Sequence, residues 1–583
     1  MLSKILGLNA FHGDASAALV VDGCLIAAAE EERFRRIKHW AGFPEQAIQY
    51  CLNEGGLSIS DIDAIAINQN PNAHFWQKLK YILQKRPNVA MILDRLKNKN
   101  LRKDPLSHLK NLYPGVDIGA VIAPIEHHIA HLSSAHLVSP FEKSVVVSVD
   151  GFGDFSSACW GLGDGQNIQV DGRVYFPHSL GIFYQALTQY LGFMNYGDEY
   201  KVMGLAPYGE PRYLDQLRKV VLLKDDGSFE LNLQYFRHHR ERIDYTWNDG
   251  EPQVGHLYSS ALVDLLGPAR SKSEPLTQYH WDIARSVQAM YEQALFHLLH
   301  KLYEKYQISN LTLAGGCAMN SVANGRIYQN TPFKKLYVQS AAGDAGGAIG
   351  AAFAVASENK NLKRFYMNHA YWGPHFSDDE IGQVLKMQEQ EIDSAQCEIE
   401  YIKQESDLVK KTAEAISKGN VVGWFQGRME WGPRALGNRS ILADPRRGDM
   451  KDILNLKIKR RESFRPFAPS ILREQVGDWF ETIDDVPFMM QVYSIAPEHR
   501  QKIPAVTHVD GSGRLQTVDK STNPRYWNLI HSFYELTGVP ILLNTSFNEN
   551  EPVVCHPQEA LNCFLRTKMD ILVLGNYYIK RSN

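Results

Sequence analysis

Apolar and polar positions alternate along this chain in short blocks that turn residues separate. Residues 5–8, 16–21 and 24–29 are apolar runs whose lengths are typical of strands. An Asp-Gly dipeptide at 22–23 lies between the second and third runs and is a two-residue hairpin signal. The pattern predicts a strand, a loop, a second strand, a tight turn and a third strand within residues 4–34.

A second block of the same kind begins at Ser144. The apolar run 145–149 ends in an Asp-Gly-Phe-Gly-Asp loop at 150–154, and small residues then lead to another strand that includes Trp160. The first block has a comparable loop at 11–16. Two blocks of strand, Gly- and Asp-containing loop and strand predict an internally duplicated α/β unit with two lobes.

Two glycine-rich stretches follow later in the same half of the chain. Residues 311–320 join a strand to Gly-Gly, and residues 343–350 lead into an alanine-rich helix. Strand-to-helix junctions of this kind present backbone N–H groups to which phosphate can bind. With the two Asp-containing loops, they indicate a nucleotide- or phosphate-binding unit.

The composition changes over residues 358–376, where a polar, mostly basic stretch precedes a rigid Tyr-Trp-Gly-Pro turn. A capping box at 377–380 then opens a helix. We therefore predict two domains, residues 1–370 and 371–583.

The second domain also begins as an α/β unit. Apolar positions over 408–416 have helical spacing, with Ser406 as the expected N-cap and Gly419 at the end of the helix. The apolar run 421–425 predicts the strand that follows.

Composition and charge narrow the functional classes. Charged residues make up 22% and hydrophobic residues 44% of the chain, as in globular proteins. A net charge of -3 argues against a nucleic-acid-binding protein, which usually has a strongly basic face. The seven cysteines include no CxxC pair, which favours reduced thiols over a disulfide framework or zinc ribbon. No run of 18 apolar residues occurs. We expect a cytoplasmic protein that binds neither nucleic acid nor membrane.

Residues 76–110 are basic and amphipathic. The simpler interpretation is a solvated helical insertion. The alternative is a surface patch that recognises either the acceptor substrate of a transfer reaction or an anionic surface.

A metal site is predicted from two histidines and two aspartates. His127 and His131 are four residues apart, so on a helix their side chains point to the same side and can reach one metal ion. Asp150 lies at the end of the following strand and is a candidate oxygen ligand, and Asp344 is a candidate for a fourth ligand. The alternative is that His127 and His131 lie on one face of a helix and bind no metal.

Acid-base chemistry is predicted for the loop of the first block. An acceptor hydroxyl is a poor nucleophile unless a base removes its proton, and His12 and Asp14 are candidates for this role. The alternative is that both residues only stabilise the turn. No chemistry is expected of His128 or His136.

The second domain is rich in side chains that bind anions. Residues 431–440 and 455–469 interleave Arg and Lys with Pro and aromatic residues, and residues 543–548 form a strand followed by a polar loop. This pattern indicates a rigid pocket for carboxylate or phosphate groups. The alternative is an exposed basic surface.

Six motifs together resemble the NodU/CmcH-type O-carbamoyltransferases. They occur in the family's order and span nearly the whole chain: residues 12–18 (HGDASAA), 127–131 (HHIAH), 150–154 (DGFGD), 201–209 (KVMGLAPYG), 432–440 (GPRALGNRS) and 464–469 (FRPFAP).

The resemblance implies an α/β protein with a two-lobed actin-like ATPase (ASKHA) domain and a C-terminal YrdC-like domain. The YrdC-like domain would make carbamoyl-adenylate from carbamoyl phosphate and ATP. The first domain, with a metal that is commonly iron, would then pass the carbamoyl group to a hydroxyl of a small molecule. The implied cofactors are ATP, Mg and Fe(II) or another divalent metal, and a homodimer is compatible with the sequence.

The resemblance also assigns roles to residues. It implies that His127, His131, Asp150 and Asp344 are metal ligands and that His12 is the acceptor-side catalytic histidine. The implied nucleotide-binding residues of the first domain are Gly151, Gly153, Gly315, Gly316 and Asn320. The implied carbamoyl phosphate and ATP site of the second domain comprises Arg434, Lys459, Arg465, Arg514, Asn544 and Ser546.

Four alternative functions fit the sequence less well. A tRNA threonylcarbamoyl-modifying enzyme shares both folds, but balanced charge and the fusion of both domains argue against it. A hydrogenase-maturation protein would carry an acylphosphatase module and CxxC zinc fingers, which this sequence lacks. A sugar kinase would not need the C-terminal arginines, and a non-catalytic ATP-binding regulator would not need the complete set of motifs.

The acceptor is not determined by the motifs. The family modifies nodulation oligosaccharides, antibiotics and alkaloid toxins of the saxitoxin type. Residues 76–110 and 210–275 are the least motif-like, and we predict that they determine acceptor choice.

Overall fold

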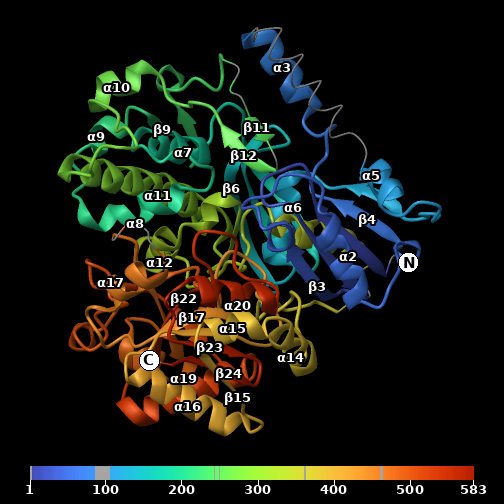
Figure 1. Cartoon of the computed structure of the whole chain (residues 1–583). Helices are drawn as coiled ribbons and strands as arrows, with labels where there is room; N and C mark the ends of the chain where they lie inside the picture. The colour runs from blue at the N-terminus through green and yellow to red at the C-terminus, as the bar shows by residue number, and fades with distance from the viewer. Residues whose placement is uncertain are drawn as a thin grey trace. The chain divides into compact units, whose positions relative to one another are not determined.

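The computed structural model describes residues 3–85, 105–241, 243, 245–248, 250–359, 363–459, 462 and 464–582. The chain divides into two compact units, Met1–Met367 and Asn368–Asn583. Both are mixed α/β structures (Figure 1).

The first unit contains two five-stranded sheets. The strand order of the first sheet is β3-β2-β1-β4-β5, and that of the second is β14-β13-β6-β7-β8. The strands of the first sheet are β1 (Lys4–Asn9), β2 (Ser16–Val21), β3 (Cys24–Glu30), β4 (Ala64–Ile67) and β5 (Val121–Pro124). Those of the second are β6 (Lys143–Gly153), β7 (Ser156–Asp164), β8 (Asn167–Tyr175), β13 (Asn310–Ala314) and β14 (Lys335–Tyr337).

The two sheets have the same topology. In each sheet the first three strands in sequence pair antiparallel, and two later strands add parallel on the other side of the first. The strands predicted at 16–21 and 24–29 begin at the predicted residues. The predicted duplication is therefore confirmed at the level of strand order.

Helix α13 (Gly346–Ala356) packs against α6 (His127–His136) and against β1. Its glycines permit this close approach. A Cβ at Gly350 would lie 1.8 Å from the Ala130 carbonyl oxygen of α6, and a Cβ at Gly7 of β1 would lie 2.0 Å from the Ala348 carbonyl oxygen. The Ala/Gly composition of α13 thus fixes the position of α6, the helix that carries two of the predicted metal ligands.

The first unit contains four further helices that pack on its strands or on each other. They are α2 (Glu45–Glu54), α8 (Glu199–Leu205), α11 (Gln278–Tyr306) and α12 (Ser321–Asn330). In the described part of the chain, none of the helices is both long and apolar enough to cross a bilayer.

The second unit is built on an eight-stranded mixed sheet of order β15-β24-β23-β16-β17-β22-β18-β21. The strands are β15 (Cys397–Tyr401), β16 (Val422–Phe425), β17 (Arg439–Ala443), β18 (Ala468–Leu472), β21 (Gln516–Val518), β22 (Ile541–Ser546), β23 (Ile571–Leu574) and β24 (Tyr577–Arg581). Two of its helices, α16 (Glu405–Ser417) and α19 (Pro524–Thr537), pack on each other.

Sequence signals predicted some of these elements. The capping box at Ser377 opens α14 (Asp378–Met387) as predicted. The predicted N-cap at Ser406 was wrong, because α16 begins at Glu405 after Gln404. The carboxylates of Glu405 and Asp407 lie in its first turn, where they favour an earlier helix start by interacting with the helix dipole.

The amphipathic stretch predicted at 76–110 includes two described helices. They are α3 (Phe75–Lys85) and α5 (Pro105–Leu112). Residues 86–104 lie outside the described residues.

Candidate metal centre and anion-binding residues

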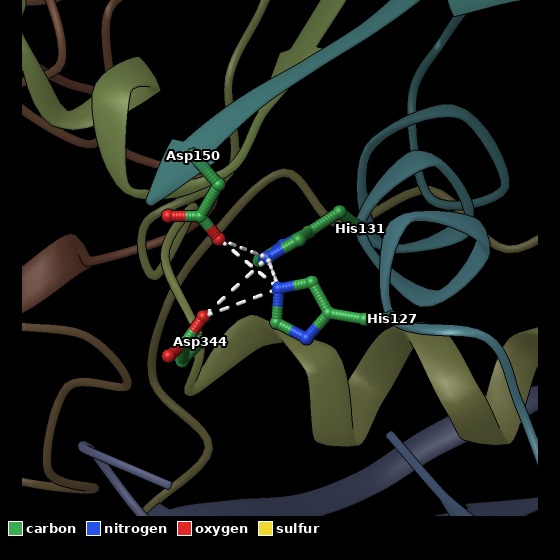
Figure 2. A group of neighbouring side chains, drawn as sticks. All are labelled: His127, His131, Asp150 and Asp344. Carbon is green, nitrogen blue, oxygen red and sulfur yellow. Dashed lines mark hydrogen bonds and ion pairs between the residues drawn. The ribbon is translucent and has the colours of Figure 1, made fainter. Parts of the chain in front are cut away.

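The four predicted metal ligands meet in the first unit (Figure 2). His127 and His131 come from α6, Asp150 from β6, and Asp344 from the loop before α13. The Nε2 atoms of the two histidines are 3.0 Å apart. Asp150 Oδ2 lies 3.1 Å from His127 Nε2 and 2.9 Å from His131 Nε2. Asp344 Oδ1 lies 3.6 Å and 3.5 Å from the same two nitrogens.

These distances fit a shared divalent cation. Ligand atoms about 2.1 Å from one ion lie roughly 3.0–3.4 Å apart at neighbouring octahedral or tetrahedral positions. The separations of 2.9–3.6 Å lie close to this range. Two imidazole nitrogens this close cannot both point protons at each other, whereas both lone pairs can be directed at one ion. The donor set of two imidazoles and two carboxylates suits iron or another first-row divalent metal.

Burial makes the charges in this group interdependent. Burial alone would lower the pKa of His131, but hydrogen bonds and charge from Asp150 and Asp344 raise it to about 9. Burial raises the pKa of Asp344, and the neighbouring Asp150 carboxylate raises it further. Burial opposes ionisation of Asp150, but hydrogen bonds from His127 and His131 hold its pKa well below the usual range. The protonation of His131, Asp150 and Asp344 is therefore coupled through these contacts.

Backbone N–H groups orient the Asp150 carboxylate. Its Oδ1 accepts hydrogen bonds from Gly151 N at 2.7 Å and from Gly316 N at 3.0 Å. Both bonds are to Oδ1, so Oδ2 is left toward the histidines. Gly315 has a φ of +90°, and a Cβ there would lie 2.2 Å from the Val149 carbonyl oxygen. Only glycine therefore allows the backbone at this position to approach β6 so closely.

Four of the five predicted nucleotide-binding residues therefore adjoin the metal cluster. Gly151, Gly315 and Gly316 surround Asp150, and a Cβ at Gly153 would lie 2.0 Å from the His127 ring. The fifth, Asn320, caps α12 through Ala323 N and exchanges amide hydrogen bonds with Gln288 of α11. Its side chain thus fixes the loop that carries Gly315 and Gly316.

Side chains that surround the start of α6 hold its histidines in place. Glu126 accepts hydrogen bonds from His128 N and Ile129 N as the N-cap, and Arg173 Nη2 lies 2.9 Å from its carboxylate. Asp154 Oδ2 accepts from His127 N at 2.9 Å. Glu126 was not predicted as a functional residue, although a carboxylate directly before a predicted helix is a recognisable capping signal.

The first-block residues lie beside this group. The ring centroids of His12 and His127 are 5.8 Å apart. The Asp14 carboxylate instead accepts a hydrogen bond from His39 Nδ1 at 2.7 Å. His39 was not predicted, because an isolated histidine has no spacing signal in the sequence.

His128 and His136 are both hydrogen-bonded to serine side chains. His128 Nδ1 is 2.9 Å from Ser148 Oγ, and His136 Nδ1 is 2.9 Å from Ser144 Oγ.

In the second unit, the predicted anion-binding residues gather near the end of β22. Ser546 pairs with the start of β17, and Asn544 pairs with Ala468 at the start of β18. Asn544 Nδ2 also donates to Ala435 O and Gln516 Oε1, each at 3.1 Å. Arg434 directly precedes Ala435, Arg514 lies two residues before Gln516, and Arg465 lies three residues before Ala468. The backbone therefore brings these three arginine positions toward one end of the sheet.

Lys459 is buried, and its ammonium group binds protein oxygens. Its Nζ donates to Ser546 O at 2.7 Å, Asn548 O at 2.8 Å and Asn548 Oδ1 at 2.7 Å. The lysine therefore holds the loop after β22. Arg439, the second arginine of the motif at 432–440, is also buried and donates to the backbone carbonyls of Gln426 and Pro374.

Family models match most of the chain. The model described as "Carbamoyltransferase N-terminus" matches residues 4–353, and that described as "Carbamoyltransferase C-terminus" matches residues 413–581. This chain belongs to the carbamoyltransferase family. It is therefore a transferase enzyme.

Relatives of this carbamoyltransferase share its full length. An uncharacterized Synechocystis protein is 42% identical over 100% of this chain and 97% of that protein. Nodulation protein NolNO of Sinorhizobium fredii is 40% identical over 98% of this chain and 80% of its own length. Nodulation protein U of Rhizobium tropici is 28% identical over 94% of this chain and 91% of its own length. Among solved structures, T. kodakarensis HypF matches 62% of this chain and 48% of its own length, with 11% sequence identity and a TM-score of 0.32. A TM-score this low does not establish a shared fold.

One glycine substitution tests the geometry of this carbamoyltransferase's metal cluster. Gly153→Ala should lower metal affinity at least about tenfold, because the new methyl group would overlap the His127 ring and displace a ligand. Metal content after dialysis against graded chelator concentrations measures this effect. Gly151→Ala is the matched control, since a Cβ there would have no described atom within 4 Å apart from its neighbours in the chain. Equal metal retention by the two variants would contradict the assignment.

Proposed function

We propose that this carbamoyltransferase is an ATP-dependent O-carbamoyltransferase. In the proposed reaction, the second unit converts carbamoyl phosphate, ATP and water to carbamoyl-adenylate, phosphate and pyrophosphate. Water takes the phosphoryl group of carbamoyl phosphate to give phosphate, and the released carbamate oxygen attacks the α-phosphorus of ATP and displaces pyrophosphate. The first unit then transfers the carbamoyl group to a hydroxyl of a small molecule. The observation that carries the proposal is the convergence of His127, His131, Asp150 and Asp344 in a chain whose two halves match the two carbamoyltransferase models.

Charge complementarity supports activation in the second unit. Carbamoyl phosphate is a small dianion, and Arg434, Arg465 and Arg514 belong to segments that meet near the end of β22. Guanidinium groups suit bidentate contacts with phosphate and carboxylate. Adenylation then gives the carbamoyl carbon a good leaving group. Ser546 and Asn544 lie on the strand end that these segments surround.

Two features support transfer in the first unit. The repeated sheet topology agrees with the expected actin-like fold, and the glycines beside β6 leave backbone N–H groups near Asp150. A divalent ion held by the four ligands would act as a Lewis acid on a carbonyl or phosphate oxygen. His12 lies next to His127, and Asp14 shares its loop, so both are candidates to take the proton of the acceptor hydroxyl.

The proposed acceptor is a small molecule with a hydroxyl group. We assign its selection to residues 76–110 and 210–275. Exchange of these segments between family members should change which acceptor is carbamoylated. Unchanged acceptor preference after the exchange would disprove the assignment.

Mass spectrometry of the purified chain with ATP, magnesium and carbamoyl phosphate, without acceptor, tests the activation step. The expected products are carbamoyl-AMP and pyrophosphate, and omission of carbamoyl phosphate is the control. Absence of carbamoyl-AMP from folded, metal-loaded protein would overturn the proposal. In a separate assay with an acceptor, inhibition of carbamoyl transfer by added tRNA would favour a tRNA-modifying enzyme.

A further inference from the structure

Two loops of the first unit are joined beside the metal cluster. Phe11 N donates to Gly42 O at 3.1 Å, and Ala15 N donates to Trp40 O at 2.8 Å. Asn9 Nδ2 also donates to the carbonyl oxygen of Asp14, at 3.1 Å. The loop that carries His12 and Asp14 is therefore fixed to the segment that carries His39.

The backbone in both loops is strained. Phe11, Asp14 and His39 have φ values of 59°, 59° and 55°, in the left-handed region that disfavours residues with a side chain. Each such residue costs on the order of 1–3 kcal/mol, and such strain is concentrated at functional sites. The strained residues include both members of the Asp14–His39 hydrogen bond.

His39 is held from several directions. Its backbone N donates to Glu32 Oε2 at 2.8 Å, and its ring packs edge-on against Tyr196 at 5.3 Å between centroids. A Cβ at Gly197 would lie 2.5 Å from His39 Nε2, so the ring occupies space that only glycine leaves open. These contacts direct Nδ1 toward Asp14 Oδ1, at 2.7 Å.

We propose that His39 is a positioning residue for carbamoyl transfer, which fixes Asp14 so that its second carboxylate oxygen receives the proton of the acceptor hydroxyl. This inference rests on the proposed function. The Asp14 side chain is 31% exposed, and within the described part of the chain no hydrogen bond reaches Oδ2. In this step the acceptor oxygen bonds to the carbamoyl carbon, its proton passes to Asp14, and AMP leaves with the electrons of the broken C–O bond.

The charges around His39 agree with this role. Burial alone would lower the pKa of His39, but the Asp14 charge and hydrogen bond, with a smaller contribution from Glu32, raise it to about 9. Lys38 opposes this effect, and Glu199 is a further carboxyl group nearby. The imidazole is therefore mainly protonated at neutral pH and donates to Asp14 from Nδ1.

A double-mutant cycle tests the inference. His39→Leu removes the donor, His39→Gln retains an N–H donor, and Asp14→Asn removes the charge of the carboxylate. Release of pyrophosphate in the first turnover measures the activation step. The transfer step is measured as the rate at which carbamoyl-adenylate reacts with water, and with glycerol as a second probe hydroxyl. His39→Leu should slow transfer about 10- to 100-fold and leave activation unchanged, and His39→Gln should restore part of the rate. The double variant Asp14→Asn/His39→Leu should be no slower than Asp14→Asn alone, because His39 acts through Asp14.

The outcomes separate the two proposals. If the wild type releases no pyrophosphate, the proposed function fails. If the wild type forms the adenylate but the two single substitutions have additive effects on transfer, or His39→Leu has none, the positioning role fails. His531→Leu is the matched control, since it removes an exposed histidine beside Glu535 in the second unit. Ring-nitrogen NMR of His39 gives an independent result: an ordinary pKa that Asp14→Asn leaves unchanged would overturn the inference whatever the rates.

Discussion

Replacing His131 by alanine should remove the bound divalent metal and slow carbamoyl transfer more than about a hundredfold, while carbamoyl-adenylate formation continues. Loss of a residue that only supports a ligand already costs 10- to 100-fold in metal affinity, so loss of a ligand should cost more. His131 Nε2 is the nitrogen closest to both Asp150 Oδ2 and Asp344 Oδ1, at 2.9 Å and 3.5 Å. Without it, the two carboxylates repel each other across a buried space.

Metal analysis and the two partial reactions measure this effect on the same preparation. His128→Ala is the matched control, because it removes a buried histidine of the same helix that is not one of the four predicted ligands and whose Nδ1 is hydrogen-bonded to Ser148 Oγ. Circular dichroism establishes that both variants are folded. A His131→Ala protein that retains stoichiometric metal and normal transfer would show that the cluster is not the metal centre.

Lys459→Met should abolish most carbamoyl-adenylate formation and destabilise the protein. The buried ammonium donates to Ser546 O, Asn548 O and Asn548 Oδ1, and methionine fills a similar volume without a donor. Leaving these oxygens without their donor should cost about 3 kcal/mol in free energy of unfolding. Because Ser546 ends β22 directly before this loop, we also expect activation to slow by roughly a hundredfold, as when a single well-aimed donor is lost.

Denaturant unfolding of the full chain and pyrophosphate release measure the two effects. Lys457→Met is the matched control, because Lys457 lies two residues away in a partly exposed ion pair with Asp570, 2.7 Å apart. Such a pair contributes at most about 1 kcal/mol. Similar losses of stability in the two variants would show that Lys459 does not hold the loop.

The local pattern of the chain predicted the elements that position the site. Strands over 16–21 and 24–29, the capping box at Ser377 and the helical spacing of His127 and His131 depend on residues close in sequence, and each was found. The N-cap of α16 was misplaced because a favourable capping residue, Ser406, competes with the acidic residues on either side of it.

The long-range contacts could not be predicted in this way. The Asp14–His39 pair joins residues 25 positions apart, and Lys459 binds a loop 87 to 89 positions away. Nothing in the sequence marks His39 as the partner of Asp14 or Asn548 as the partner of Lys459. The assignment of Lys459 and Asn320 as ligand-binding residues came from motifs, whereas their contacts in the structure support loops.

The sequence by itself determined the family, the duplicated strand blocks and the residue types of the metal cluster, because these depend on short motifs, period-two strands and an i, i+4 pair on one helix. Only the tertiary structure decided how the four predicted metal ligands converge, since Asp150 and Asp344 reach α6 through separate elements. It likewise decided which polar side chains serve as supports, because a buried polar group must find partners wherever the fold supplies them.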